Sequence, residues 1–227
     1  KTKTTDKGGN ASESAENITA KTSNLVAGTL TLTHNTASGS AYTSNTWTKD
    51  SVYVALVKAS TGTTTYESLA DSAQTVVAGT ASNEKINTTG TTTLKVTTTD
   101  GTNTVKSGEY IIKVDKNAPT NTAPTTSVTT NSVTVTCKQT DSLSGINAST
   151  TQYAIYKGSS WSAWQTSDTF TGLIHNAEYK VKTQVSDNVG NTSESNETTI
   201  STKKLEAGTL KLNLINASGN SYVSGQW

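Results

Sequence analysis

The stretch GLIHNAEYKVKTQVSDNVGN, residues 172–191, decides the fold of this chain. Tyr179, Val181 and Val185 alternate with polar residues, and Asp, Asn and Gly follow at once. An apolar period of two is typical of a β-strand with one buried face, and Asp, Asn and Gly are typical of tight turns. The stretch therefore predicts a long strand that ends in a turn.

Similar alternation occurs along the rest of the chain. The runs are SVYVALV at 51–57, TLKVTT at 94–99 and SVTVTC at 132–137. No segment shows a sustained apolar period of 3.6, and turn residues separate the short runs, which is the pattern of an all-β sandwich. Thr and Ser make up 76 of the 227 residues, while only 31% are hydrophobic. Because threonine favours strands and tolerates water, we expect it on the outer faces of the sheets.

Two segments of the chain occur twice. AGTLTLTHNTASGSAYTSNTW at 27–47 returns as AGTLKLNLINASGNSYVSGQW at 207–227, with 11 of 21 residues identical. DKGGNASES at 6–14 returns as DNVGNTSES at 187–195. A period of about 180 residues is too long for one solenoid turn but suits one or two whole domains. Both prolines lie within 115–126, which is therefore the expected boundary between two complete sandwiches, 27–118 and 119–204.

Two motifs resemble known families. Leu173, six positions before Tyr179, resembles the tyrosine corner of fibronectin type III domains, in which the tyrosine hydroxyl bonds back to the preceding turn. That family usually has a proline two residues after the leucine, where this chain has His175. YTSNTWTKDSVYV at 42–54, followed by VDKNAPT at 114–120, resembles the bacterial immunoglobulin-like repeats of large cell-surface proteins.

These resemblances imply an order of modules in a linear array of sandwiches. Residues 1–26 would end a fibronectin type III-like module, and 27–118 would form an immunoglobulin-like one. Residues 119–204 would form a fibronectin type III-like module, and 205–227 would start the next immunoglobulin-like module. Tyr42 and Trp47 recur in the repeat, so we assign them to packing.

Repeated modules predict a structural role. We expect a non-enzymatic segment of a long bacterial surface protein, extracellular or secreted, that acts as a stalk, fibre or adhesin scaffold. The alternative is a spacer or carbohydrate-binding accessory of a secreted multidomain glycoside hydrolase. The expected partners are neighbouring repeats of the same chain. Other copies in a fibre, joined by strand addition, and a glycan or host surface ligand are the alternatives.

Charge and hydropathy limit the other function classes. The formal net charge is +1 and the charges are scattered, so no basic footprint for nucleic acid is present. No run of 18 apolar residues occurs, and we expect no membrane span in this segment. The two histidines, His34 and His175, fall in different modules, and no local nucleophile signature accompanies them. We therefore expect no catalytic residues.

Two stretches and two tryptophans are the candidates for a metal or ligand site. TDSLSGINAS at 140–149 and SDNVGN at 186–191 each offer one aspartate, whereas calcium takes six to eight oxygens. We expect these residues to hold turns, with no cofactor, and calcium is the alternative. Trp161 and Trp164 are the candidates for stacking on a ligand. Their spacing of three in an extended segment predicts opposite faces, one indole in the core and one exposed.

Overall fold

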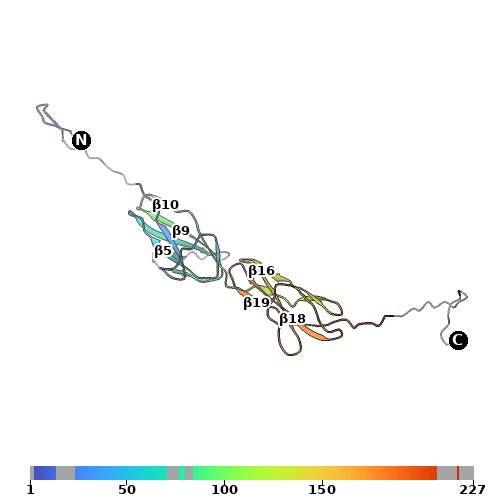
Figure 1. Ribbon diagram of the computed structural model, residues 1–227. Coiled ribbons are helices and arrows are strands. Elements are labelled where there is room, and N and C mark those ends of the chain that lie inside the picture. The colour runs from blue at the N-terminus through green and yellow to red at the C-terminus, as the bar shows by residue number, and fades with distance from the viewer. Residues whose placement is uncertain (1–2, 14–23, 71–76, 80–83, 209–218, 220–227) are drawn as a thin grey trace. The chain divides into compact units, whose positions relative to one another are not determined.

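The computed structural model of the chain describes residues 3–13, 24–70, 77–79, 84–208 and 219. Its elements over these residues are all strands, so the predicted all-β class is confirmed. The chain divides into two compact units, Lys1–Lys116 and Asn117–Trp227, shown in blue to green and green to red in Figure 1. No helix in the described part is long and apolar enough to cross a membrane.

The N-terminal unit contains two sheets and a short hairpin. One sheet has the order β3-β5-β8, and the other has the order β4-β11-β9-β6-β7, with β10 also paired to β9. The strands are β3 (Thr29–His34), β4 (Trp47–Thr48), β5 (Val52–Val57), β6 (Thr63–Ala70), β7 (Val77–Gly79), β8 (Glu84–Ile86), β9 (Gly90–Thr99), β10 (Thr104–Lys106) and β11 (Tyr110–Val114). The hairpin joins β1 (Lys3–Thr5) to β2 (Ala11–Glu13).

The core of the N-terminal unit follows from the alternation in its strands. Every second residue of β5, beginning with Val52, is buried. The buried cluster consists of Leu30, Leu32, Tyr42, Val52, Val54, Leu56, Tyr66, Leu94, Val96, Ile112 and Val114. Tyr42 lies in this core while its hydroxyl donates to the carbonyl of Thr46 and accepts the N–H of Lys113. The recurring tyrosine therefore ties two segments of one unit together.

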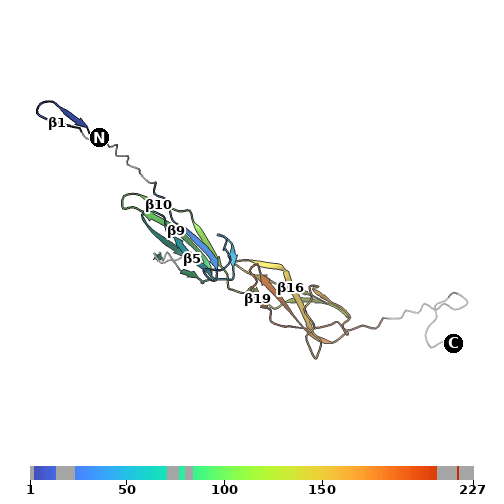
Figure 2. The same ribbon diagram turned by 60° about the vertical axis from the view of Figure 1, so that its left-hand side comes forward.

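The C-terminal unit also has two main sheets. One has the order β13-β14-β17, and in the other β18 pairs with β16 on one side and with β19 and β20 on the other. The strands are β12 (Thr120–Asn121), β13 (Thr125–Val128), β14 (Val133–Thr136), β15 (Gln139–Thr140), β16 (Ile146–Tyr156), β17 (Thr169–Phe170), β18 (Glu178–Asp187), β19 (Thr192–Glu194) and β20 (Thr198–Ser201). Figure 2 shows the long strand β16 of this unit in yellow, and in the sheet β18 separates it from β19.

Burial alternates without a break along β18, which explains why residues 172–191 decide the fold. Its inward residues Tyr179 and Val181 belong to a core with Val133, Val135, Ile155, Phe170, Leu173 and Ile200. The Tyr179 hydroxyl accepts a hydrogen bond from the N–H of Ile174 at 2.9 Å, and Leu173 is buried beside it. This bond connects the start of β18 to the preceding turn, although His175 stands where a proline is usual.

The expectation that threonine lies on the outer faces of the sheets is only partly correct, because some threonines are buried. Thr64, Thr98 and Thr183 are buried. The hydroxyls of Thr64 and Thr98 lie 3.2 Å apart, and Thr98 also accepts the N–H of Gly28. The Thr183 hydroxyl donates to the side chain of Asn121 at 3.0 Å. A buried hydroxyl costs little once it is hydrogen-bonded, which is why threonine can enter these cores.

The described residues contain most of the two complete modules. The predicted opening of a further immunoglobulin-like module at 205–227 lies outside them, except for residues 205–208 and 219. Part of the predicted segment 1–26, residues 1–2 and 14–23, also lies outside. The division into four modules at 26, 118 and 204 therefore stays a prediction.

Candidate functional site

The two tryptophans proposed for ligand stacking lie around one lysine of β18. The Nζ atom of Lys182 is 4.7 Å from the ring centroid of Trp161 and 5.1 Å from that of Trp164. Lys182 also forms an ion pair with Glu194 on the neighbouring β19, with 2.8 Å between nitrogen and oxygen. We call Trp161, Trp164 and Lys182 the indole–lysine cluster. Its geometry is that of a double cation–π contact.

Both indoles face the same ammonium group, so the expectation of opposite faces is wrong. The reason is that residues 157–168 do not form a regular strand. Isolated bridges pair Tyr156 with Trp161 and Tyr153 with Gln165, and the segment therefore folds back along β16. The Tyr156 and Trp161 rings are 5.7 Å apart and packed at a tilt. Both tryptophans are partly buried.

The chemistry of this cluster favours a structural role. A sugar stacks on the open face of an aromatic ring, whereas here Lys182 lies over both rings. A lysine that contacts two indoles loses little by being partly buried, because the rings and Glu194 compensate its charge. The cluster thus fastens the segment between β16 and β17 to the central strand β18. The stacking of Trp161 and Trp164 on a ligand stays a prediction.

We expect Lys182→Ala to lower the free energy of unfolding by about 1–2 kcal/mol, because two cation–π contacts of about 0.5–1 kcal/mol each are lost. Chemical denaturation followed by circular dichroism measures this change. Lys180→Ala is the matched control. Lys180 lies on the same strand as Lys182, forms an ion pair with Glu197 at 3.0 Å and is more exposed than Lys182. Equal losses in the two variants would contradict a special role for the indoles.

Three aspartates head hairpin turns, and two of them, Asp6 and Asp187, have the same hydrogen-bond pattern. At Asp187 one carboxylate oxygen accepts the N–H groups of Val189 and Asn191, and the other accepts the side-chain amide of Asn191. Asp6 accepts the equivalent bonds from Gly8 and Asn10. Such side-chain caps stabilise tight turns. The interpretation of these residues as turn-holders therefore agrees with the bonds that they make.

The third of these turns joins β9 to β10 in the N-terminal unit. Asp100 accepts the N–H groups of Thr102 and Asn103 and, at 3.3 Å, the side-chain amide of Asn103. Backbone donation from Asn103, then from Thr102, lowers the pKa of Asp100 below its ordinary value of 3.8. At Asp6 the largest cause of the lowered pKa is instead the side chain of Asn10. A lowered pKa means that the ionised carboxylate favours the folded turn.

This difference predicts unequal effects of two matched substitutions. Asn10→Ala should raise the pKa of Asp6 by more than Asn103→Ala raises that of Asp100, since the Asn10 side chain is the largest cause of the lowered pKa at Asp6, whereas two backbone donors act more strongly than the Asn103 side chain at Asp100. Because both folded-state pKa values lie below 3.8, each contribution to stability is complete above that pH and is lost as pH falls through the folded-state value. Carboxyl ¹³C NMR titration measures both values. Equal rises would contradict the assigned causes.

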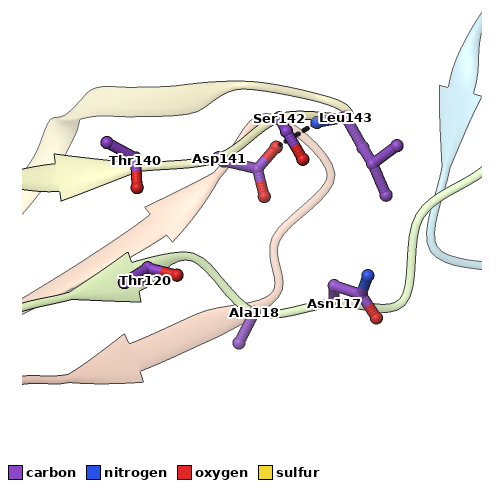
Figure 3. Close-up of a pocket in the computed structure, with 7 residues that line it drawn as sticks. All are labelled: Asn117, Ala118, Thr120, Thr140, Asp141, Ser142 and Leu143. Atoms are coloured by element: carbon purple, nitrogen blue, oxygen red, sulfur yellow. Dashed lines mark hydrogen bonds between the residues drawn. The ribbon is translucent and has the colours of Figure 1, made fainter.

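A pocket of about 260 Å³ lies in the C-terminal unit between residues 117–120 and the loop after β15. Figure 3 shows the Asp141 carboxylate and the Leu143 side chain directed from this loop toward that segment. One Asp141 oxygen accepts the N–H groups of Leu143 and Gly145, at 2.9 and 2.8 Å. The Asp141 side chain therefore holds this loop through hydrogen bonds to the loop's own backbone.

Two aspartates that are far apart in sequence meet near this pocket. Carboxylate oxygens of Asp141 and Asp187 lie within 4.8 Å of each other. The side-chain amide of Asn188 donates to the carbonyl of Ser144 at 2.7 Å, which holds the two loops together. In the sequence these two stretches are separate, and each has one aspartate. Asp141 and Asp187 are the residues of this unit that could hold a cation, while their Oδ1 atoms already serve the turns.

The two histidines lie in different units and make different contacts. His34 contacts Thr48 and Asp50 through the same ring nitrogen, Nδ1, at 3.4 and 3.7 Å. A catalytic relay instead uses one ring nitrogen for the nucleophile and the other for the carboxylate. His175 belongs to the C-terminal unit, where it lines a groove with Ile174 and Leu205. Sequence reasoning missed this groove.

Comparison with known proteins finds likeness in fold. Neither a protein-family model nor a curated protein matches the chain. Titin domains A168–A170 are similar with a TM-score of 0.44 and 12% identity, over 79% of this chain and 67% of theirs.

Two further solved structures are also tandem modules. The FN1–FN3 domains of chicken CNTN1 have a TM-score of 0.36 and 12% identity, over 71% of this chain and 65% of theirs. The fibronectin(III)-like modules of Clostridium thermocellum CbhA have a TM-score of 0.30 and 14% identity, over 80% of this chain and 100% of theirs. At these identities the likeness concerns the fold alone.

Proposed function

We propose that this chain is a structural, non-enzymatic segment of a long repetitive bacterial surface protein. It acts outside the cell as part of a stalk, fibre or adhesin scaffold, and its neighbours are further copies of the same modules. Its work is mechanical, because repeated sandwiches set the length at which another part of the protein is displayed.

One observation carries the proposal: the shorter sequence repeat, at 6–13 and 187–194, is also a structural repeat. In the hairpin of β1 and β2, Lys3 pairs with Glu13 and Thr5 with Ala11. At an offset of 181 residues, Gln184 pairs with Glu194 and Ser186 with Thr192 in the hairpin of β18 and β19. The Asp–Asn network at the turn is the same in both copies. Two copies with the same register and the same turn chemistry support a tandem array in which the same type of module recurs.

The composition of the chain supports the same role. Only 15% of residues are charged, and the formal net charge is +1. A nearly neutral surface covered with hydroxyl groups gives weak long-range fields, and nonspecific ionic binding is therefore limited. This property suits a spacer that must not adhere along its own length.

The alternative function, a carbohydrate-binding accessory of a glycoside hydrolase, depends on open aromatic faces. The indole–lysine cluster disfavours it, because the ammonium group of Lys182 lies over both candidate rings. Titration of the chain with soluble polysaccharides, followed by tryptophan fluorescence, should leave the emission unchanged up to millimolar sugar. Saturable binding that is lost in Trp161→Ala and Trp164→Ala would favour the alternative.

Mass spectrometry of the native polypeptide, with mapping of both ends, tests the proposal. The sample comes from the cell surface or the medium where the protein occurs. We expect a very large product with many copies of this repeat and a surface-attachment sequence. A chain with few copies joined to a catalytic domain would overturn the stalk function and make these modules enzyme accessories.

A further inference from the structure

An apolar groove lies at the end of the C-terminal unit from which the chain leaves. Its volume is about 280 Å³, and its lining consists of Thr130, Asn131, Leu173, Ile174, His175 and Leu205. Ile174 is 70% exposed and Leu205 is 61% exposed, and they are two of the four large exposed hydrophobic residues in the described part of the chain. Adjacent exposed apolar side chains often mark an interaction site.

The backbone around this groove is fixed. The N–H of Leu173 donates to the carbonyl of Asn131 at 2.9 Å, and the N–H of Lys203 donates to the carbonyl of Thr129 at 2.8 Å. The hydroxyl of the buried Thr202 donates to the carbonyl of Ile174 at 2.6 Å. These bonds join two loops to the departing chain. Ile174 is thus presented on a rigid support, and Leu205 follows only three residues after Thr202.

The first immunoglobulin-like sandwich shows which exposed apolar residues a following copy would have at its entering end. Val26 and Val57 are the other two large exposed hydrophobic residues. Val57 ends β5 and pairs with Thr29, the first residue of β3. Gly28, just before that strand, donates its N–H to the hydroxyl of Thr98 in a hydrogen bond of 3.0 Å. The end at which the chain enters this module is therefore apolar.

The repeat limits how far apart these two ends can lie. At an offset of 180 residues, Leu205 aligns with Leu25 and Gly208 with Gly28. Gly208 follows the anchored Thr202 by six positions, and a fully extended chain over those six steps spans at most about 22 Å. Leu205 lies midway along this short connection. Glu206 replaces Val26 in the second copy, which leaves the counterpart of Val57 as the apolar partner.

We propose that the groove formed by Ile174, His175 and Leu205 is the docking site for the entering end of the next immunoglobulin-like module, which begins at residue 207. This proposal rests on the proposed tandem array and adds a specific joint to it. Docking buries the exposed Ile174 and Leu205 side chains and stiffens the connection between consecutive modules. An array with such joints resists bending more than one with free linkers.

The test uses the chain extended after Trp227 by residues 48–116, the aligned continuation of the first copy, which completes the second module. Amide hydrogen exchange at Ile155 and Val181 reports the opening of the C-terminal unit. We expect exchange about tenfold slower in the extended chain than in the original, because burial of two aliphatic side chains is worth roughly the 1.4 kcal/mol that corresponds to tenfold. Ile174→Ser with Leu205→Ser should remove this gain and leave exchange in the original chain unchanged.

Matched controls separate the outcomes. Val57→Ser in the first copy should leave the gain intact, whereas the same change in the grafted copy should reduce it. Equal exchange in the extended and original chains, or a gain that survives Ile174→Ser with Leu205→Ser, would overturn the docking site. A concentration-dependent dimer of the original chain that these substitutions abolish would also overturn it, with a second molecule as occupant. None of these results depends on the number of repeats in the native polypeptide, which tests the proposed function separately.

Discussion

Replacement of Ile155 by alanine is expected to lower the free energy of unfolding of the C-terminal unit by about 2–5 kcal/mol. Ile155 has no exposed surface and lies among Val133, Phe170 and Val181 in the core of that unit. Truncation removes three methyl or methylene groups and leaves a cavity that the surrounding strands fill only in part. Since a domain is stable by only about 5–15 kcal/mol, this loss is a large fraction of the total.

The matched control for this prediction is Ile174→Ala, which makes the same chemical change at a side chain that is 70% exposed. It should change the free energy of unfolding by no more than about 0.5 kcal/mol. Urea denaturation followed by circular dichroism and tryptophan fluorescence measures both variants. A cost at Ile174 comparable to that at Ile155 would show that burial in this structure does not describe the protein in solution.

The sequence predicted the strands well where one face of a strand is buried. The run at 179–185 lies within β18, and the runs at 51–57 and 94–99 overlap β5 and β9 closely. This is because a period of two is a local property that only a half-buried strand requires. The turn at Asp187 was also predictable, since Asp, Asn and Gly favour turns by themselves.

The arrangement of the candidate site depends on contacts that no local pattern encodes. Lys182 is an outward-facing residue of β18, and nothing in its neighbourhood connects it with Trp161 or Trp164. The indoles reach it because the segment after β16 folds back on that strand. Asp141 and Asp187 likewise meet through the pairing of β16 with β18, which places Ile146 opposite Asp187. Their proximity is a property of the sheet.

Burial of threonine has the same explanation. Thr183 enters the core because its hydroxyl reaches Asn121, which is 62 residues away in the chain. Composition gives the number of hydroxyl groups in the chain. Only the tertiary structure determines which of them are buried and hydrogen-bonded. A sequence rule that places every threonine on the solvent side therefore fails at the residues with the most specific contacts.

Replacement of Asp187 by alanine is expected to lower the free energy of unfolding by about 2–6 kcal/mol, because two partly buried N–H groups lose their acceptor at about 1–3 kcal/mol each. These are the N–H groups of Val189 and Asn191, 2.9 and 2.8 Å from the carboxylate. Asp187 itself is 1% exposed, so water cannot easily take its place. The same substitution at Asp6 should cost far less, since all of β1 and β2 is exposed to solvent.

The variant Asp187→Asn separates a turn-holding role from a cation-binding role. An asparagine keeps the oxygen that accepts both N–H groups but has no charge, so a turn-holder tolerates it and loses about half as much as with alanine or less. We also expect the midpoint of thermal unfolding of the native sequence to be the same in EDTA and in millimolar calcium. A cation site predicts the opposite, because calcium prefers charged carboxylates and would bind only the folded state. If calcium raises that midpoint, and if Asp187→Asn and Asp141→Asn both abolish the rise, then the 4.8 Å approach of these two carboxylates serves an ion and not only the turns.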